Sequence, residues 1–248
     1  MRKLEFGIVG YGRFGRLLAR VLSPRGRVAV CDRSQIELDP AERAAGIEAL
    51  PLPEVALARL VLLAVPIRVL EATTRELAPH LRRGTIVADT ASVKVWPARW
   101  LLAHLDPEVE AIATHPLFGP DSARDGVRGC KLFIAPLRLR HPRALRRMLD
   151  ELGLEVIEAT PDEHDREMAE TQALTHWLGR GLEEFGAGPR RLDTLGYRRL
   201  LEILEYVRHD SIELFQDLER FNPHAEAARA RFLAKLEALH LANRARRG

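Results

Sequence analysis

A histidine that stands next to prolines is the residue whose type and surroundings most directly suggest chemistry. His115 is followed by Pro116 and Pro120, and the apolar residues before it, Ala111 to Ala113, are typical of the end of a buried strand. Because each proline fixes φ and lacks an amide donor, the backbone is predicted to leave the sheet at this point. Ligands bind at the carboxyl edge of such a sheet, and an imidazole there can accept a proton near neutral pH. His115 is therefore a candidate general base, with an ordinary loop histidine as the plainer alternative.

A glycine-rich turn near the start of the chain predicts a dinucleotide site. The turn consists of Gly10, Tyr11, Gly12, Arg13, Phe14 and Gly15. It follows the apolar run Leu4–Val9 and precedes leucines at helical spacing, so strand, turn and helix succeed one another. Gly10 permits the tight turn, Gly12 lets the backbone approach a pyrophosphate, and Gly15 lets the helix pack closely on the strand. Free amides at the helix N-terminus would then bind the phosphates, whereas a glycine turn without a ligand is the alternative.

The residues after the second apolar run indicate which nicotinamide cofactor is used. Asp32 ends that run close to the distance from Gly15 expected of an acid that binds the ribose. A carboxylate there bonds the 2′-hydroxyl of NAD and repels the 2′-phosphate of NADP, so NAD is favoured. Arg33 and Ser34 follow directly and could bind that phosphate if the Asp32 side chain turned away, which leaves NADP open. All three residues join the predicted cofactor contacts.

Two further runs continue the predicted sheet and bring polar groups to its carboxyl edge. The apolar run from Leu60 to Val65 ends at Pro66, as is typical of a central strand buried on both faces. Its end, at Val65 and Pro66, should face the cofactor. The next strand, Thr85 to Ala88, is followed by hydroxyls and opposite charges. Among these, Ser92 could cap the following helix, or it could hydrogen-bond the His115 imidazole and set its tautomer.

The composition limits the class of protein. With 248 residues, of which 46% are hydrophobic and 29% charged, the chain matches a globular enzyme large enough for two domains. The net charge of +3 comes from arginines interspersed with acids, so nucleic acid is not expected as a partner. Neither a long apolar run nor a signal pattern is present, which favours a cytoplasmic protein without membrane contact. Cys31 and Cys130 lack metal-ligand spacing, so no metal site is expected.

Strand patterns stop near residue 160, and the remainder predicts helices. Apolar stripes recur there at helical spacing, and a short helical tail cannot bury all of them within itself. Some stripes should pack on the sheet domain and some on another subunit. The sequence thus predicts an α/β protein with a Rossmann-type, doubly wound and mainly parallel sheet that binds NAD(P) in residues 1–160. Residues 161–248 are expected to form an all-helical substrate and dimerisation domain of a homodimer.

A row of mostly polar residues runs along the first of these helices. Its members recur at i, i+4 spacing and are His164, Met168, Gln172, His176 and Arg180. Successive members rotate by about 40° around the helix axis, so they form one slanting row beside the apolar face. Two imidazoles and a guanidinium suit an anionic ligand, while a solvated helix face would show the same pattern.

Four motifs span nearly the whole chain. They are Gly10-x-Gly12-x-x-Gly15, Asp89-x-x-Ser92-Val93-Lys94, Thr114-His115-Pro116-Leu117-Phe118-Gly119-Pro120 and Gln172-x-x-Thr175-His176-x-x-Gly179-Arg180. Together they resemble the prephenate/arogenate dehydrogenases of tyrosine biosynthesis. The resemblance implies a Rossmann domain, a helical dimerisation domain and NAD(P)-dependent oxidation of a small 4-hydroxycyclohexadiene carboxylate with loss of carbon dioxide. It also implies that His115 binds and helps deprotonate the substrate hydroxyl and that Ser92 supports this histidine. His176 matches a family histidine associated with substrate binding, and His164 matches one near the domain junction.

Departures within these motifs bear on the choice of substrate. The residues after the His-Pro pair are closer to the plant and arogenate-type branch than to many bacterial members. An arginine that would hold a substrate carboxylate cannot be aligned uniquely, since Arg198, Arg199 and Arg208 all qualify. The segment around Asp210 resembles the arogenate type, in which this acid would meet the substrate ammonium, and Asp121 is a second candidate. The predicted substrate contacts are Asp121, Ser122, Gln172, His176, Arg180 and Asp210.

The leading hypothesis is a dehydrogenase that converts arogenate or prephenate to tyrosine or 4-hydroxyphenylpyruvate, with arogenate favoured. A small-acid dehydrogenase of the 3-hydroxyacid type is an alternative. That group depends on a lysine in its helical domain, however, and after Lys131 this chain has only Lys235, near the C-terminus. A non-catalytic NAD-binding regulator is the alternative from a different class, and it would bind NADH without turning over either substrate.

Overall fold

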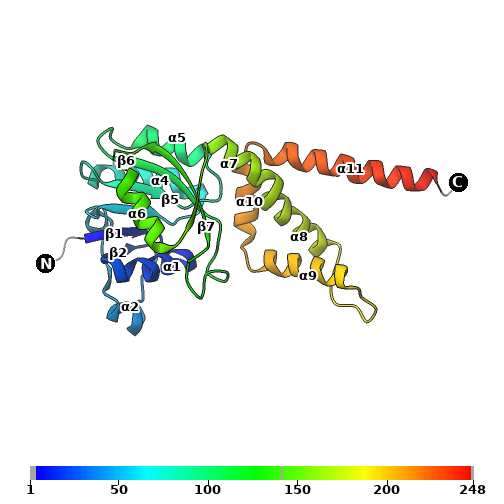
Figure 1. Ribbon diagram of the computed structural model, residues 1–248, viewed down its shortest axis with the longest axis horizontal. Helices are drawn as coiled ribbons and strands as arrows, with labels where there is room; N and C mark the ends of the chain where they lie inside the picture. Colours follow the sequence, from blue (N-terminus) through cyan, green and yellow to red (C-terminus); the bar gives the residue numbers. More distant parts are fainter. Residues whose placement is uncertain (1–3, 141, 247–248) are drawn as a thin grey trace. The chain divides into compact units, whose positions relative to one another are not determined.

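The computed structural model describes residues 4–140 and 142–246, which fall into two compact units (Figure 1). The first unit is Met1–Pro161 and the second is Asp162–Gly248, so the division lies one residue beyond the boundary expected from the sequence. All of the described strands belong to the first unit.

Eight strands of the first unit form one sheet in the order β3-β2-β1-β4-β5-β6-β7-β8. The strands are β1 (Leu4–Val9), β2 (Arg27–Cys31), β3 (Ile47–Ala49), β4 (Leu60–Leu63), β5 (Ile86–Asp89), β6 (Glu110–Pro116), β7 (Lys131–Arg138) and β8 (Glu155–Glu158). The first six strands in this order, from β3 to β6, are parallel to one another, while β7 is antiparallel to β6 and β8 is parallel to β7. The strand order reverses between β1 and β4, which is the switch point where ligands bind in such sheets. The predicted doubly wound, mainly parallel sheet is confirmed.

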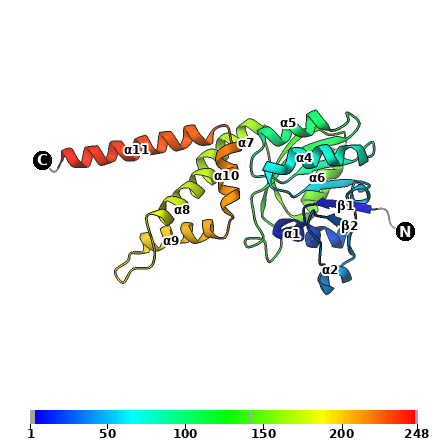
Figure 2. The same ribbon diagram turned by 180° about the vertical axis from the view of Figure 1, so that it is seen from behind.

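Helices cover both faces of this sheet, as Figure 1 and, from behind, Figure 2 show. The helices of the first unit are α1 (Arg13–Leu22), α2 (Pro40–Ala44), α3 (Leu52–Val55), α4 (Ile67–Leu77), α5 (Val95–His104) and α6 (Pro142–Leu152). One core joins α1 and α6 to the face of the sheet that carries Ile112 and Leu132. On the opposite face, Ala98 of α5 packs with Ala113 and Phe133. Successive residues of β6 therefore fill different cores, as expected of a strand that is buried on both sides.

Strand β6 is longer than the sequence predicted. It runs to Pro116, and β7 pairs with it along this length, with Pro116 opposite Leu132. The prediction that the backbone leaves the sheet before Pro116 is therefore wrong. Strand β5 pairs with β6 only as far as Ile112, so the end of β6 has β7 as its one paired neighbour in the described sheet. A proline at such a position can leave its missing amide on the unpaired side, where no hydrogen bond is lost.

The second unit is built from helices, with a loop over residues 185–194 and otherwise short connections. They are α7 (Pro161–Met168, which begins at the boundary), a π-helical turn (Ala169–Ala173), α8 (Leu174–Glu184), α9 (Leu195–Arg208), α10 (Ile212–Phe221) and α11 (Ala225–Ala245). Helices α8 and α9 pack along each other, with Leu204 and Val207 of α9 buried. Four leucines of α11 are exposed, namely Leu233, Leu236, Leu239 and Leu241. None of the helices in the described ranges has the length and apolarity that crossing a membrane requires.

Candidate active site

The glycine turn between β1 and α1 is tight at its two ends and open at its centre. Gly10 has a φ of +98°, a left-handed conformation that favours glycine, and a Cβ there would collide with the Ala64 carbonyl. A Cβ at Gly15 would collide with the Gly10 carbonyl, because α1 starts directly against the end of β1. At Gly12, by contrast, a Cβ would meet nothing within 4 Å. A ligand can therefore approach the backbone in front of the turn.

The N-terminus of α1 lies beside an acidic side chain. Gly12 is the N-cap and provides no side-chain acceptor, and the first turn of α1 contains no acid. Asp32, directly after β2, accepts hydrogen bonds from the amides of Tyr11 at 2.7 Å and Ser34 at 2.9 Å. The Asp32 carboxylate thus points toward the glycine turn, which is the arrangement that favours NAD over NADP. Arg33 beside it is exposed. Open backbone, free helix amides and a ribose-binding acid together fit a dinucleotide.

The end of β4 lies beside the same turn. The Ala64 amide donates to the Val9 carbonyl at 2.8 Å, so β4 stays paired with β1 up to the turn. Val65 is adjacent to Gly10, where its Cγ1 would lie 2.9 Å from a Cβ. Pro66 is the N-cap of α4. The structure therefore places Val65 and Pro66 at the switch point of the sheet, where their predicted cofactor contacts would be made.

The loop after β6 is fastened to the glycine turn. Arg13 Nη2 contacts the two carboxylate oxygens of Asp121 at 2.6 and 2.8 Å, and both side chains are largely exposed. The rings of Phe14 and Phe118 lie with their centroids 6.2 Å apart. Asp121 thus pairs with an arginine of its own unit, while the Ser122 hydroxyl accepts a loop amide at 2.9 Å. Substrate contacts by Asp121 and Ser122 stay predictions.

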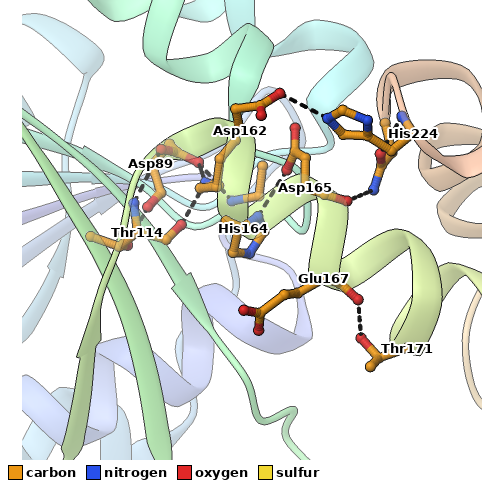
Figure 3. A network of polar contacts seen from close by, with 11 residues as sticks. Asp89, Thr114, Asp162, His164, Asp165, Glu167, Thr171 and His224 are labelled. Carbon is orange, nitrogen blue, oxygen red and sulfur yellow. Dashed lines mark hydrogen bonds and ion pairs between the residues drawn. The ribbon is translucent and has the colours of Figure 1, made fainter.

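A buried ion pair lies at the carboxyl ends of β5 and β6, and Figure 3 shows Asp89 beside Thr114. Asp89 and Lys94 are both fully buried, and Lys94 Nζ contacts Asp89 Oδ1. The ammonium also donates to the Thr114 carbonyl at 2.6 Å, and Asp89 accepts from the Ala91 amide at 2.9 Å. Burial raises the pKa of Asp89, and the Lys94 ammonium opposes that shift. Lys94 was not among the predicted site residues, although the opposite charges after β5 were a signal for it.

The candidate base belongs to the sheet and not to a loop. His115 is 4% exposed, and its backbone lies opposite Phe133 of β7. The residue before it, Thr114, is held at its carbonyl by Lys94, so the position of the imidazole depends on buried structure. Ser92 is half-buried between β5 and α5, and its hydrogen bond to His115 stays a prediction. The alternative that Ser92 caps α5 is wrong, because the N-cap of that helix is Lys94.

The polar row expected along one continuous helix is interrupted. Ala169–Ala173 form a π-helical turn between α7 and α8. A π turn contains more residues than an α turn, so i, i+4 spacing no longer keeps residues on one face. The prediction of a single slanting row is therefore wrong, because His164 lies before the π turn, Gln172 within it and His176 after it. Gln172 Oε1 is buried and lacks a hydrogen-bond partner within residues 4–140 and 142–246.

The second unit assembles a separate polar cluster around His176. This residue is fully buried, and neither ring nitrogen forms a hydrogen bond within the described part of the chain. The nearest acid is Asp210, whose Oδ2 lies 3.4 Å from Nε2, and the Tyr206 ring packs edge-on with its centroid 6.2 Å away. Burial lowers the pKa of His176, and the Asp210 carboxylate opposes that shift. The structure thus brings together two predicted substrate contacts, His176 and Asp210, with Arg180 one helical turn from the histidine.

His164 belongs to a different network, which joins α7 to the start of α11 (Figure 3). Its Nδ1 lies 2.8 Å from Asp165 Oδ1, and both residues are buried. The Asp165 carbonyl accepts from Asn222 at 2.8 Å, and His224 Nε2 lies 2.8 Å from Asp162 Oδ1. The hydrogen bond from His224 lowers the pKa of Asp162. The bonds from α7 to the start of α11 are thus made by Asp162 and by the Asp165 backbone, and His164 is held beside them by the Asp165 side chain.

The chain is similar to known proteins over most of its length. Residues 16–133 match the family model "Prephenate dehydrogenase, nucleotide-binding domain", and residues 181–244 match "TYRAAT1-like, C-terminal domain". The chain is 30% identical to arogenate dehydrogenase 2, chloroplastic, from Arabidopsis thaliana, over 96% of this chain and 68% of the relative. That relative is chloroplastic by name, so the cytoplasmic location expected for this chain stays a prediction.

Two solved structures have a similar fold. Synechocystis arogenate dehydrogenase superposes with a TM-score of 0.75 at 24% identity, over 97% of this chain and 93% of that one. Prephenate dehydrogenase from A. aeolicus, in complex with hydroxyphenyl propionate and NAD+, also gives 0.75, at 18% identity, over 97% of this chain and 90% of that one. At these identities the similarity shows a common fold.

Proposed function

Because this chain belongs to the prephenate/arogenate dehydrogenase family, we propose that it oxidises arogenate or prephenate, with NAD as hydride acceptor and with release of carbon dioxide. The observation that carries the proposal is the position of His115. It lies at the carboxyl end of β6, on the same sheet edge as the open glycine turn and Asp32. A proton acceptor and a dinucleotide cradle on one edge are what oxidation of a secondary alcohol requires.

Different residues of the chain bind the cofactor and accept the proton in this proposed reaction. The amides of α1 and the turn around Gly12 bind the pyrophosphate, and Asp32 binds the ribose. The chemistry that NAD supplies when bound is acceptance of a hydride from the carbinol carbon. His115 takes the hydroxyl proton, and the bond between the ring and its carboxylate breaks as the ring becomes aromatic. Release of carbon dioxide and aromatisation make the step effectively irreversible.

An absorbance assay at the NADH band, run with arogenate, prephenate and a 3-hydroxyacid, tests this proposal. NADH formation with either cyclohexadienol supports it. Turnover of the 3-hydroxyacid alone would favour the small-acid alternative. NADH binding without turnover of any substrate would favour a non-catalytic regulator.

We further propose that Asp210 recognises the amine of arogenate. The two substrates share the ring carboxylate, but the side chain carries an ammonium in arogenate and a keto group in prephenate. A carboxylate near that carbon attracts the ammonium, whereas prephenate leaves the same carboxylate without a partner. The support is that Asp210 is about one-third exposed and lies 3.4 Å from the buried His176. Arogenate is therefore the favoured substrate.

Replacing Asp210 with asparagine is expected to move the kcat/KM ratio toward prephenate by about 10- to 100-fold, the usual worth of a hydrogen bond to a charged group. Both kcat/KM values are measured on the same enzyme batch. Glu202→Gln is the control, because Glu202 is an exposed acid of α9 in the same unit. If Asp210→Asn leaves the kcat/KM ratio unchanged, or if the native enzyme strongly prefers prephenate, then Asp210 does not recognise the amine.

We also propose a homodimer through the second unit, as expected from the sequence, and take α11 as the helix that makes the contact. Leu236 and Leu239 are 45% and 61% exposed on this helix, and a second copy would bury them. Light scattering at micromolar concentration should give the mass of two chains. The double variant Leu236→Glu/Leu239→Glu should give the mass of one, while Glu237→Gln on the same helix should not change it. A native monomer would contradict the proposal.

A further inference from the structure

We propose that Arg180 is a positioning residue for substrate selection, because its guanidinium holds the end of α9 and thereby sets the carboxylate of Asp210 beside His176. The inference rests on the proposed role of Asp210 in recognising the amine. It gives Arg180 a task different from the substrate contact predicted from the sequence.

The contacts of Arg180 are directed at the C-terminal end of α9. Its Nη2 donates to the carbonyl of Asp210 at 3.0 Å and to that of Val207 at 3.4 Å. Val207 lies in the last turn of α9 and Asp210 in the turn that follows, so the guanidinium lies at the negative dipole end of this helix. The Val207 carbonyl also accepts the Asp210 amide at 3.2 Å, and Arg180 adds to the bonds that close this turn. The Arg180 side chain is only 18% exposed, which limits the directions in which it can move.

A carboxylate of α8 fixes both this guanidinium and the last residue of α9. Glu183 Oε2 lies 2.9 Å from Arg180 Nη1, and Glu183 Oε1 lies 3.1 Å from Arg208 Nε. Bonds from Arg208 and Arg180 lower the pKa of Glu183, so the carboxylate stays ionised at neutral pH. Glu183 therefore links α8 to the end of α9 at the point where the chain turns toward Asp210.

The helix backbones meet at the same point. A Cβ placed on Gly179 would lie 2.6 Å from Val207 Cγ2, and Val207 is fully buried. Glycine is thus required there for the close approach of α8 to α9. On the other side of Asp210, Ser211 is the N-cap of α10 and accepts the Leu214 amide at 3.1 Å. Asp210 lies in a short turn whose two ends are both fixed.

A different role for Arg180 predicts a different kinetic result. If Arg180 bound the ring carboxylate, its loss would weaken both substrates equally, because arogenate and prephenate share that group. If it positions Asp210, its loss affects the substrate with the ammonium more than the other. Nη1 donates to Glu183 and Nη2 to two backbone carbonyls, which supports the positioning role, while Nε is buried and has no hydrogen-bond partner among the described residues.

The test is Arg180→Lys, since a lysine keeps the positive charge but cannot bond Glu183 and two carbonyls from one planar group. The kcat/KM ratio of arogenate to prephenate is expected to fall by about 5- to 10-fold, as one or more hydrogen bonds are lost. Glu183→Gln should shift the ratio in the same direction by a smaller factor. Arg191→Lys is the control, because Arg191 is an exposed arginine of the loop before α9.

The double variant Arg180→Lys/Asp210→Asn separates the possible outcomes. If Arg180 acts through Asp210, the double variant has the same ratio as Asp210→Asn alone. The positioning role of Arg180 is overturned if Asp210→Asn changes the kcat/KM ratio of the two substrates but Arg180→Lys does not. It is also overturned if Arg180→Lys raises KM equally for both substrates. Neither outcome contradicts recognition of the amine by Asp210. If Asp210→Asn leaves the kcat/KM ratio unchanged, both the recognition of the amine by Asp210 and the positioning role of Arg180 are overturned.

Discussion

The variant His115→Asn is expected to lower kcat by about 10²- to 10⁴-fold, which is the usual contribution of a positioned general base. Asparagine preserves polarity and approximate size at a site that is 4% exposed, so the strand pairing with Phe133 should persist. Binding of NAD should also persist, because the glycine turn and Asp32 belong to other strands. Steady-state NADH formation gives kcat, and titration with NAD gives its Kd.

The pattern of the kinetic change identifies the role. An interaction made only in the transition state lowers kcat and kcat/KM equally, whereas lost ground-state binding raises KM alone. His80→Asn is the control, because His80 is exposed and follows the C-terminal end of α4, whereas the N-terminal end of that helix begins at Pro66 on the site edge. A His115→Asn enzyme with native turnover would exclude His115 from the mechanism and leave it a buried structural residue of β6.

The features predicted correctly from the sequence are those that short segments specify. The three glycines of the turn impose their geometry through the conformation of Gly10 and the absence of a Cβ at Gly15, and both effects act within a few residues. The position of Asp32 after β2 follows equally from local pattern. Strand β6 was predicted too short because the effect of Pro116 depends on whether a second strand lies beside it, which only the sheet reveals.

The features that the sequence did not predict depend on segments distant along the chain. Asp121 pairs with Arg13 across 108 positions, and no spacing rule predicts such a contact. The π turn at Ala169–Ala173 changes which face His176 occupies, and its residue types are also compatible with an ordinary α-helix. The cluster of Arg180, Glu183 and Asp210 likewise requires α9 to return beside α8.

The buried pair of Asp89 and Lys94 gives the largest expected effect on stability. Lys94→Met should lower the free energy of unfolding by about 3–5 kcal/mol, because it leaves the Asp89 carboxylate buried without its counter-charge. Both side chains are fully buried, and the Thr114 carbonyl loses its bond from the ammonium as well. Urea unfolding of the full chain measures the change. Lys131→Met is the control, since Lys131 is 55% exposed and its ammonium lies as far as 4.0 Å from the Glu155 carboxylate. The change in its free energy of unfolding should stay within about 0.5 kcal/mol.

Two further measurements separate the charge effect from a simple loss of packing. The double variant Asp89→Asn/Lys94→Met should be more stable than Lys94→Met alone, because no uncompensated charge remains. If the double variant is less stable than the single one, the ion pair is not the cause. Loss of stability in Lys131→Met equal to that in Lys94→Met would also contradict the argument.

The pH dependence of Lys94→Met has a definite sign. Burial already raises the pKa of Asp89, and removal of the ammonium that opposes this shift raises it further. In the window between the unfolded pKa of about 4 and the raised folded pKa, the folded chain keeps a proton that the unfolded chain has released. Stability therefore falls as pH rises through this window, and the loss of unfolding free energy relative to the native protein should be smaller at pH 5 than at pH 8. A loss that is constant or larger at pH 5 would mean that Asp89 is not the residue left uncompensated.

Because the same ammonium holds the carbonyl of Thr114, directly before His115, the kcat of Lys94→Met should fall even at temperatures where the variant is folded.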